Sequence, residues 1–357
     1  MPHATRLKPE AQPPLRALKR LGLIVNPRAG QGQGLTIART AVQALAPAEV
    51  LIGSGEMGAA ALDNLPCTVH TYDWSGQQGK ARTPFLTRRF AQAGIDAGAM
   101  DALVVIGGDG TLADVAFALA SADIEKAPPL LGIGAGSANV GPLMTCQGDE
   151  LARLVDAQFT LQPVDALLVS ANTNIIGVAF NDVVVSFTVL ATVDGELTTV
   201  AVSEKMQGEN QPHLPEGVWT PATRIVKQSA LGEILIAQGE QVETVIVGFP
   251  DERFYGKAIT GGVLLSGLVN DGAGCLVCSQ TLVRLQLDKG SLHRVEPILS
   301  RYAGLGDDEW IEGQGFRTGA AICADGNPLF ILQPDDRLQV SLRRNLIQSC
   351  QLKPRAT

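Results

Sequence analysis

Three glycine-rich segments constrain the fold of this chain most, because each comes at the end of a short apolar run. They lie at residues 26–34, 107–111 and 132–139. Short apolar runs that stop at glycine, asparagine or proline are typical of buried strands. Between these runs, apolar residues recur at helical spacing, so the pattern predicts βαβ units and a parallel sheet. The carboxyl ends of parallel strands share one edge, and we expect the three segments to meet there.

The two halves of the chain have different periodicities. In the first half we predict strands at 21–25, 50–52, 102–106 and 130–133, and helices at 35–45, 86–93 and 112–119. In the second half we predict strands at 164–169, 174–180, 183–193, 197–202, 233–237, 242–247, 281–287, 329–332 and 338–342. Helical periodicity is scarce there, which favours a β-sandwich-like domain. The predicted fold class is therefore α/β plus all-β.

These patterns also predict the domain organisation. Residues 1–20 form a loose N-terminal leader, residues 21–147 an α/β nucleotide-binding domain, and residues 148–335 a β-rich domain for the acceptor and for oligomerisation. A final strand near 336–350 can return to the first domain. The leader contains no apolar core segment, so it is not a secretory signal, and we expect a cytoplasmic protein.

Charge and cysteine usage exclude several classes. The net charge is −8, whereas nucleic-acid-binding proteins usually carry a basic field, so no nucleic-acid partner is expected. No apolar run approaches the roughly 18 residues of a membrane helix, and no membrane partner is expected. The six cysteines are scattered, unlike a secreted disulfide framework. Cys275 and Cys278 lack a second ligand pair for zinc and are interpreted as free thiols on a buried strand.

The glycine segments predict a phosphate site built largely from backbone. Glycine supplies 39 of the 357 residues, and two of the segments lead into helices, whose first N–H groups favour phosphate. The P-loop motif is absent, and no dinucleotide-binding G-x-G-x-x-G motif follows the first predicted strand. The candidate phosphate-binding residues are Asn26, Pro27, Gly30, Gly107, Gly108, Gly110, Thr111, Gly134, Gly136 and Ser137.

Asp109 is the candidate catalytic residue. It lies between glycines just before a predicted helix, where a phosphate can come close to the backbone. Such a carboxylate can accept a proton from an attacking hydroxyl or help to place Mg²⁺. Thr111 can cap the helix or contact phosphate. The alternative is that Asp109 is an acidic turn residue.

The sequence contains Gly-Gly-Asp-Gly-Thr at 107–111 and Asn-Pro-x-x-Gly-x-Gly at 26–32. These two segments resemble motifs of the ATP-NAD kinases and of their relatives, the diacylglycerol and sphingosine kinases. Residues 131–145 are similar to the second glycine loop of the NAD kinase branch, Asn181-Asp182 to its Asn-Asp/Glu motif, and Asp325-Gly326 to its late Asp-Gly turn. From the residues alone, Asn181-Asp182 can equally be a turn that opens a strand, and the default role of Asp325-Gly326 is a structural hairpin turn. The resemblance spans about residues 21–348.

This resemblance implies a kinase that transfers a phosphoryl group from ATP, or from polyphosphate, to a hydroxyl. It implies Asp109 as the catalytic residue, Asn181 and Asp182 as acceptor-binding residues, Mg²⁺ as a cofactor with unknown ligands, and small-molecule nucleotide ligands. NAD is the possible acceptor, with NADP as the product, and the resemblance suggests a homo-oligomer.

One segment departs from the NAD kinase pattern. NAD kinases have a hydroxyl-rich Thr-Gly-Ser-Thr-Ala-Tyr segment. At the corresponding positions, 250–257, this chain has charged and aromatic residues, followed by Gly261-Gly262. In this respect the chain looks like the divergent AcoX-type branch. Two other functions therefore stay open, namely a lipid kinase of the diacylglycerol type and a nucleotide-binding regulator without turnover.

Overall fold

A parallel sheet forms the N-terminal part of the protein. The computed structural model describes residues 18–77, 81–96, 100–122, 127–135, 141–193, 196–207, 209, 211–249, 272–280 and 299–353. The strands are β1 (Arg20–Val25), β2 (Glu49–Gly53), β3 (Thr68–Tyr72), β4 (Ala102–Gly107) and β5 (Leu130–Gly134), in the order β5-β4-β1-β2-β3. All of these neighbours pair in parallel, as the sequence predicts. The short strand β6 (Met144–Gln147) adds to β5.

Helices cover both faces of this sheet. They are the short turn α1 (Ala29–Gly32), α2 (Gly34–Leu45), α3 (Arg82–Asp96) and α4 (Asp109–Ala120). Leu23 of β1 packs in the apolar core with α2, whereas the next residue, Ile24, packs in the core with α3 and α4. Successive side chains of a strand point to opposite faces, so a strand covered on both sides is apolar throughout. This explains why β1 and β4 are continuous apolar runs in the sequence.

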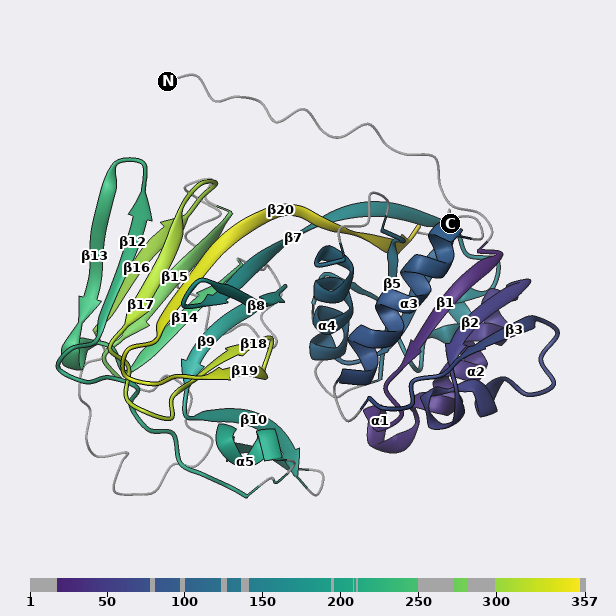
Figure 1. Ribbon diagram of the computed structural model, residues 1–357, viewed down its shortest axis with the longest axis horizontal. Coiled ribbons are helices and arrows are strands. Elements are labelled where there is room, and N and C mark those ends of the chain that lie inside the picture. The colour runs from purple at the N-terminus through teal and green to yellow at the C-terminus, as the bar shows by residue number, and fades with distance from the viewer. Residues whose placement is uncertain are drawn as a thin grey trace.

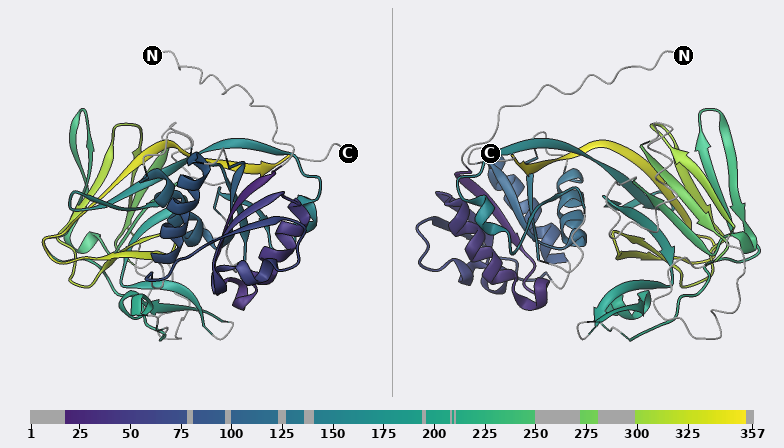
Figure 2. Two further views of the ribbon diagram at one scale, coloured as in Figure 1. Left: turned by 45° about the vertical axis from the view of Figure 1, so that its right-hand side comes forward. Right: turned by 180° about the vertical axis from the view of Figure 1, so that it is seen from behind.

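Two long antiparallel strands join this part to the rest of the chain. They are β7 (Phe159–Ala171) and β20 (Arg337–Leu352), which pair along most of their length. At one end β20 reaches the parallel sheet, where Ser349 pairs with Leu130 of β5. At its other end it pairs with β17 (Trp310–Gln314). Figure 1 shows β7 and β20 spanning the two parts of the molecule, and Figure 2 shows the same arrangement from two other sides.

The C-terminal part consists mainly of antiparallel strands in two packed layers. Its remaining strands are β8 (Asn174–Ala179), β9 (Asp182–Ser186), β10 (Thr188–Val193), β11 (Glu196–Ala201), β12 (Arg224–Ser229), β13 (Gly232–Gln238), β14 (Thr244–Gly248), β15 (Ala273–Cys278), β16 (Ser300–Leu305), β18 (Ala321–Ala324) and β19 (Asn327–Ile331). One layer is β13-β12-β17-β20, with β7 and β8 alongside, and the other is β16-β15-β14-β9-β18-β19. Apolar residues of both layers form one core, as in a β-sandwich. The hairpin β10-β11 and helix α5 (Val202–Gln207) lie beside it.

The fold class predicted from the sequence is confirmed, with differences in the strands. The single apolar run predicted at 183–193 is two strands, β9 and β10, which belong to different sheets. The run at 281–287 lies outside the described residues. Strands β3, β6, β12, β16, β17 and β18 have no counterpart in the sequence prediction. The Cys275–Cys278 pair lies on the buried strand β15 as free thiols, as predicted.

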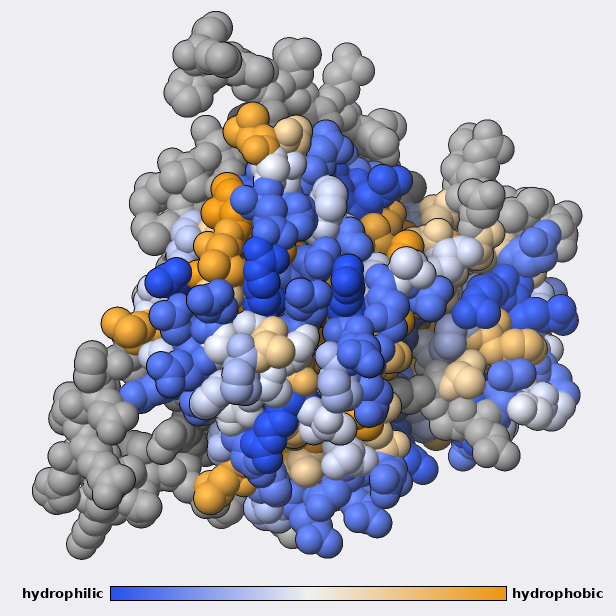
Figure 3. All heavy atoms as spheres, turned by 60° about the vertical axis from the view of Figure 1, so that its left-hand side comes forward, coloured by the Kyte–Doolittle hydropathy of each residue, from blue (hydrophilic) through white to orange (hydrophobic). Residues whose placement is uncertain are grey.

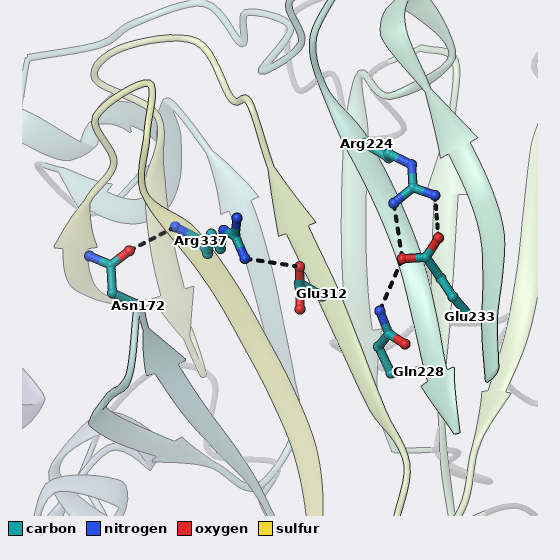
Figure 4. Close-up of polar contacts among 6 residues, drawn as sticks. All are labelled: Asn172, Arg224, Gln228, Glu233, Glu312 and Arg337. Atoms are coloured by element: carbon teal, nitrogen blue, oxygen red, sulfur yellow. Dashed lines mark hydrogen bonds and ion pairs between the residues drawn. The ribbon is translucent and has the colours of Figure 1, made fainter. Parts of the chain in front are cut away.

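The outer face of β12, β13, β17 and β20 is polar. Figure 4 shows Glu233 between Arg224 and Gln228, and Arg337 between Glu312 and Asn172. Figure 3, which views the molecule from this side, shows mostly hydrophilic side chains with separate apolar ones. An antiparallel sheet with one face on a core and one in water has this composition. Among the described residues, no helix is long and apolar enough to cross a membrane.

Candidate active site

The loop after β1 is tied to the loops after β4 and β5. The backbone N–H of Asn26 donates to the Ile106 carbonyl at 2.9 Å, and the Asn26 Nδ2 donates to Thr111 Oγ1 at 3.3 Å. Gly30 has φ 59°, and a Cβ there would lie 2.5 Å from the Ala135 carbonyl oxygen. Only glycine fits this backbone, because the left-handed region and the close approach both exclude a side chain. The three glycine segments therefore meet at one sheet edge, as the sequence predicts.

The segment 107–111 turns from β4 directly into α4. Helix α4 begins at Asp109, and Gly108 is its N-cap residue with extended backbone. The capping role considered for Thr111 is therefore wrong: Thr111 lies inside the first turn, and its hydroxyl accepts from Asn26 instead. The first N–H groups of a helix carry partial positive charge and bind anions. Gly108, Gly110 and Thr111 accordingly present a helix N-terminus to the space in front of the sheet edge.

The Asp109 side chain points toward the β-rich part. Its Oδ1 accepts from the Gly141 backbone N–H at 3.1 Å, and its Oδ2 accepts from Asn181 Nδ2 at 3.4 Å. A Cβ at Gly141 would lie 2.9 Å from Asp109 Oδ1, so the close approach requires glycine. Asn181 is only 6% exposed, and its Oδ1 has no hydrogen-bond partner among the described residues. A buried, unpaired acceptor is costly, so this oxygen is suited to a donor supplied by a ligand or by water.

Asp325 holds Asn181 and Asp182 in place. Its Oδ1 accepts from the N–H groups of Asn181 at 2.7 Å and Asp182 at 3.1 Å, and its Oδ2 accepts from the Phe180 N–H at 2.8 Å. The Asp325 N–H in turn donates to the Asp182 carbonyl at 2.9 Å. Burial raises the pKa of the Asp325 carboxyl to about 7. The nearby Asp182 and Asp109 carboxylates also raise this pKa, whereas the hydrogen bonds from the backbone N–H groups lower it.

Asp325 and Gly326 also form the turn between β18 and β19, as their sequence indicates. Both have positive φ, 48° and 71°. Two-residue hairpin turns of this kind favour Asp-Gly. The turn brings Asn327 next to Gly110 at the start of α4, since a Cβ at Gly110 would lie 3.5 Å from the Asn327 Cβ. The β-rich part thus contacts the glycine segment of the α/β part at this turn.

A pocket of about 700 Å³ lies where these elements meet. Its lining residues are Val25, Asn26, Pro27, Arg28, Ala29, Glu56, Met57, Arg82, Thr83, Gly108, Gly110, Thr111, Asp114, Asp325, Gly326 and Asn327. The cluster of Asp109, Asn181 and Asp182 adjoins this pocket, and Asp325 belongs to both. The volume is in the usual range for small-ligand sites.

The structure brings together most of the predicted site residues, but only some of them line the pocket. Asn26, Pro27, Gly108, Gly110 and Thr111 line the pocket. The other predicted residues lie behind or beside it: Gly107 ends β4, Gly134 ends β5, Gly30 packs on Ala135, and Asp109, Asn181 and Asp182 form the adjoining cluster. Gly136, Ser137 and the segment 250–257 lie outside the described residues.

Among the lining side chains that sequence reasoning did not assign to the site are Glu56, Arg82, Asp114 and Asn327. Asp114 lies on α4, only three residues beyond Thr111, and its place in the first two turns of the helix could have been a signal. Glu56 lies within the Gly53-x-Gly55-x-x-Gly58 that follows β2, which was not singled out, and Arg82 belongs to no motif. Asp325 was recognised only as a turn residue, because its contacts with 180–182 are remote in sequence.

The described residues contain no group of three or more His, Cys, Asp or Glu side chains that could hold a metal ion by themselves. Mg²⁺ commonly uses one or two carboxylates together with substrate phosphates and water. Asp114 lines the pocket beside Thr111, and this carboxylate fits such a shared site.

Residues 20–151 match the diacylglycerol kinase catalytic domain, a range that contains β1, β4 and the segment 107–111. An uncharacterised protein of Archaeoglobus fulgidus is 32% identical over 262 residues, which cover 72% of this chain and 75% of that protein.

Two solved structures share the fold. Yeast NADH kinase, crystallised with NADH, is 14% identical with a TM-score of 0.50 and covers 95% of this chain and 84% of its own. A putative diacylglycerol kinase from Bacillus anthracis is 15% identical with a TM-score of 0.50 and covers 94% of this chain and 98% of its own. The chain therefore belongs to the same family as the Archaeoglobus fulgidus protein, and its residues 20–151 match the diacylglycerol kinase catalytic domain.

Proposed function

We propose that this protein is a kinase that transfers the γ-phosphoryl group of ATP, or a phosphoryl group of polyphosphate, to a hydroxyl of NAD or of another small molecule. One observation carries the proposal: Asp109, at the N-terminus of α4, hydrogen-bonds Asn181 of the β-rich part beside a pocket that glycine segments line. Such an arrangement offers a phosphate site and a carboxylate base next to each other.

The donor phosphates occupy the pocket at the N-terminus of α4. Gly108 and Gly110 lack side chains there, so a phosphate can approach the backbone N–H groups closely. When Mg²⁺ is bound with the donor, it neutralises charge on the phosphates, and Asp114 is the lining carboxylate that would hold it. Arg28, next to Pro27, supplies a positive charge from the loop after β1.

The acceptor hydroxyl lies on the side of Asn181 and Asp182. The unpaired Oδ1 of Asn181 accepts a hydrogen bond from the acceptor, and Asp325 keeps the backbone of Asn181 in position. The acceptor oxygen attacks the γ-phosphorus, and its proton passes to the Asp109 carboxylate. The bond between the γ-phosphorus and the bridging oxygen breaks, and ADP leaves with that electron pair. Proton transfer to a positioned carboxylate is typical of kinases.

Two observations favour different acceptors. The fold of the yeast NADH kinase supports a dinucleotide acceptor, and so does the Asn181-Asp182 pair. The match of residues 20–151 to the diacylglycerol kinase catalytic domain supports a lipid acceptor instead. An AcoX-like acceptor is a third proposal, which rests on residues 250–257 of the sequence.

The test is ADP formation from Mg-ATP with NAD, NADH, diacylglycerol or small polyols as acceptor. We expect ADP release with one class of acceptor and a loss of at least about a hundredfold in Asp109→Asn, because the base is removed. Asp307→Asn is the matched control, since this carboxylate pairs with Arg344 on the surface of the β-rich part. Wild-type activity in Asp109→Asn would refute the catalytic assignment. Tight ATP binding without ADP release for any acceptor would favour a nucleotide-binding regulator over both kinases.

A further inference from the structure

Arg82 is held in one orientation at the edge of the pocket. It is the first residue of α3, and its guanidinium carbon lies 3.9 Å from the centre of the Trp74 ring. The Arg82 Nε is 3.4 Å from the Gln77 carbonyl oxygen. Trp74 is fixed in turn, because its Nε1 donates to the Ser54 carbonyl at 2.7 Å. A guanidinium stacked on an aromatic ring loses little further freedom when it binds a ligand.

Glu56 neutralises Arg82 in the absence of a ligand. The two side chains form an ion pair, and both line the pocket. Their exposures differ: the Glu56 side chain is 56% exposed, whereas the Arg82 side chain is 26% exposed. Exposed ion pairs contribute little stability, because water competes for both partners. Arg82 is therefore the fixed member of the pair, and Glu56 is the member that can turn away into solvent.

The position of Arg82 relates it to the donor rather than to the acceptor. It shares the pocket with Gly108, Gly110 and Arg28, whereas Asn181 and Asp182 do not line that pocket. The flat guanidinium presents paired N–H donors that match two oxygens of a phosphate group. We propose that Arg82 binds the phosphate chain of the donor and that Glu56 is its counter-ion when the pocket is empty. This inference rests on the proposed function, since it assigns a residue of the same donor site.

Two opposite effects follow from the assignment. Arg82→Gln removes a charged hydrogen-bond donor, so we expect polyphosphate binding to weaken about tenfold to a hundredfold. Glu56→Gln removes the competing carboxylate and its repulsion, so we expect binding to tighten about two- to fivefold. Arg82→Lys keeps the charge without the paired donors and should lie between wild type and Arg82→Gln.

The experiment is calorimetric titration of the full-length protein with inorganic tripolyphosphate, ADP and adenosine, without any acceptor. Arg82→Gln should weaken tripolyphosphate and ADP binding and leave adenosine binding unchanged. The matched controls are Arg224→Gln and Glu233→Gln, because this pair has the same chemistry on the outer face of β12 and β13 (Figure 4) and does not line the pocket. Both controls should bind all three probes as the wild type does.

Unchanged tripolyphosphate binding in Arg82→Gln, or weaker binding in Glu56→Gln, would overturn the assignment of Arg82. The gain expected in Glu56→Gln cannot arise from misfolding, which keeps the test informative if Arg82→Gln is unstable. If the wild-type protein binds neither tripolyphosphate nor ADP, the donor site of the proposed function is refuted, and the assignment of Arg82 falls with it. Binding without turnover leaves the assignment intact.

Discussion

Asp325 makes the stability of this protein depend on pH in an unusual direction. A carboxyl in an unfolded chain ionises near pH 4. In the folded protein, burial and the neighbouring Asp182 raise the pKa of Asp325 to about 7. Between these two values the folded state binds a proton that the unfolded state does not. The free energy of unfolding therefore falls as the pH rises through this window, and the contribution of Asp325 is fully present only below about pH 4.

The magnitude follows from the pKa. For a folded-state pKa of about 7, the contribution of Asp325 at pH 5 is about 2.7 kcal/mol, and at pH 8 it is close to zero. Asp325 borders the pocket, where solvent screens part of this effect, so we expect a loss of about 2 kcal/mol between pH 5 and pH 8. Asp325→Asn does not titrate. The stability difference between wild type and this variant should therefore shrink by about 2 kcal/mol over the same range.

The assay is urea unfolding followed by circular dichroism at pH 5, 6.5 and 8, in buffer with EDTA. The contributions of all other titrating groups cancel when the free energy of unfolding of the variant is subtracted from that of the wild type. Asp336→Asn is the matched control, because this carboxylate accepts from the Gln333 N–H and from Asn172 in a surface turn. This variant reports the effect of removing a hydrogen-bonded surface carboxylate. A stability difference for Asp325→Asn that stays constant, or that grows with pH, would refute the reasoning.

Three further predictions concern backbone and thiols. Gly30→Ala should destabilise the protein by about 2 kcal/mol or more in thermal unfolding, whereas Gly32→Ala, which also has positive φ but open space around it, should cost only about 1 kcal/mol. Gly141→Ala should lower kcat at least about tenfold with an ordinary melting temperature, because its Cβ displaces the Asp109 carboxylate. Iodoacetamide should modify Cys67 first in the native protein, as mass spectrometry would show, since the other five cysteines are buried.

The parallel sheet could be predicted because short stretches of sequence indicate each of its buried strands. Strands β1, β4 and β5 are buried on both faces, so each is a continuous apolar run that ends at a glycine segment. Strand β3 could not be predicted in this way. It lies at the edge of the sheet and is largely exposed, and its composition does not reflect burial.

The C-terminal strands were harder to predict for the same reason. Strands such as β16 and β17 have exposed or half-buried residues and are short, so their apolar content is low. The run at 183–193 is continuous in sequence, yet it divides at Phe187 because β9 and β10 pair with different partners. Pairing of this kind depends on residues far away along the chain, which local periodicity does not report.

The candidate site also combines features that the sequence predicts with features that depend on tertiary contacts. The sequence alone determined that glycine segments would gather at one sheet edge with Asp109 among them, because local apolar periodicity predicts alternating strands and helices and the carboxyl ends of parallel strands share one edge. Only the tertiary structure decided that Asp325 would clamp Asn181 and Asp182, and that Arg82 would stack on Trp74 beside the pocket. Asp325 contacts Asn181 across 144 positions. This contact forms only once β9 and β18 have paired as antiparallel neighbours, so no local pattern encodes it.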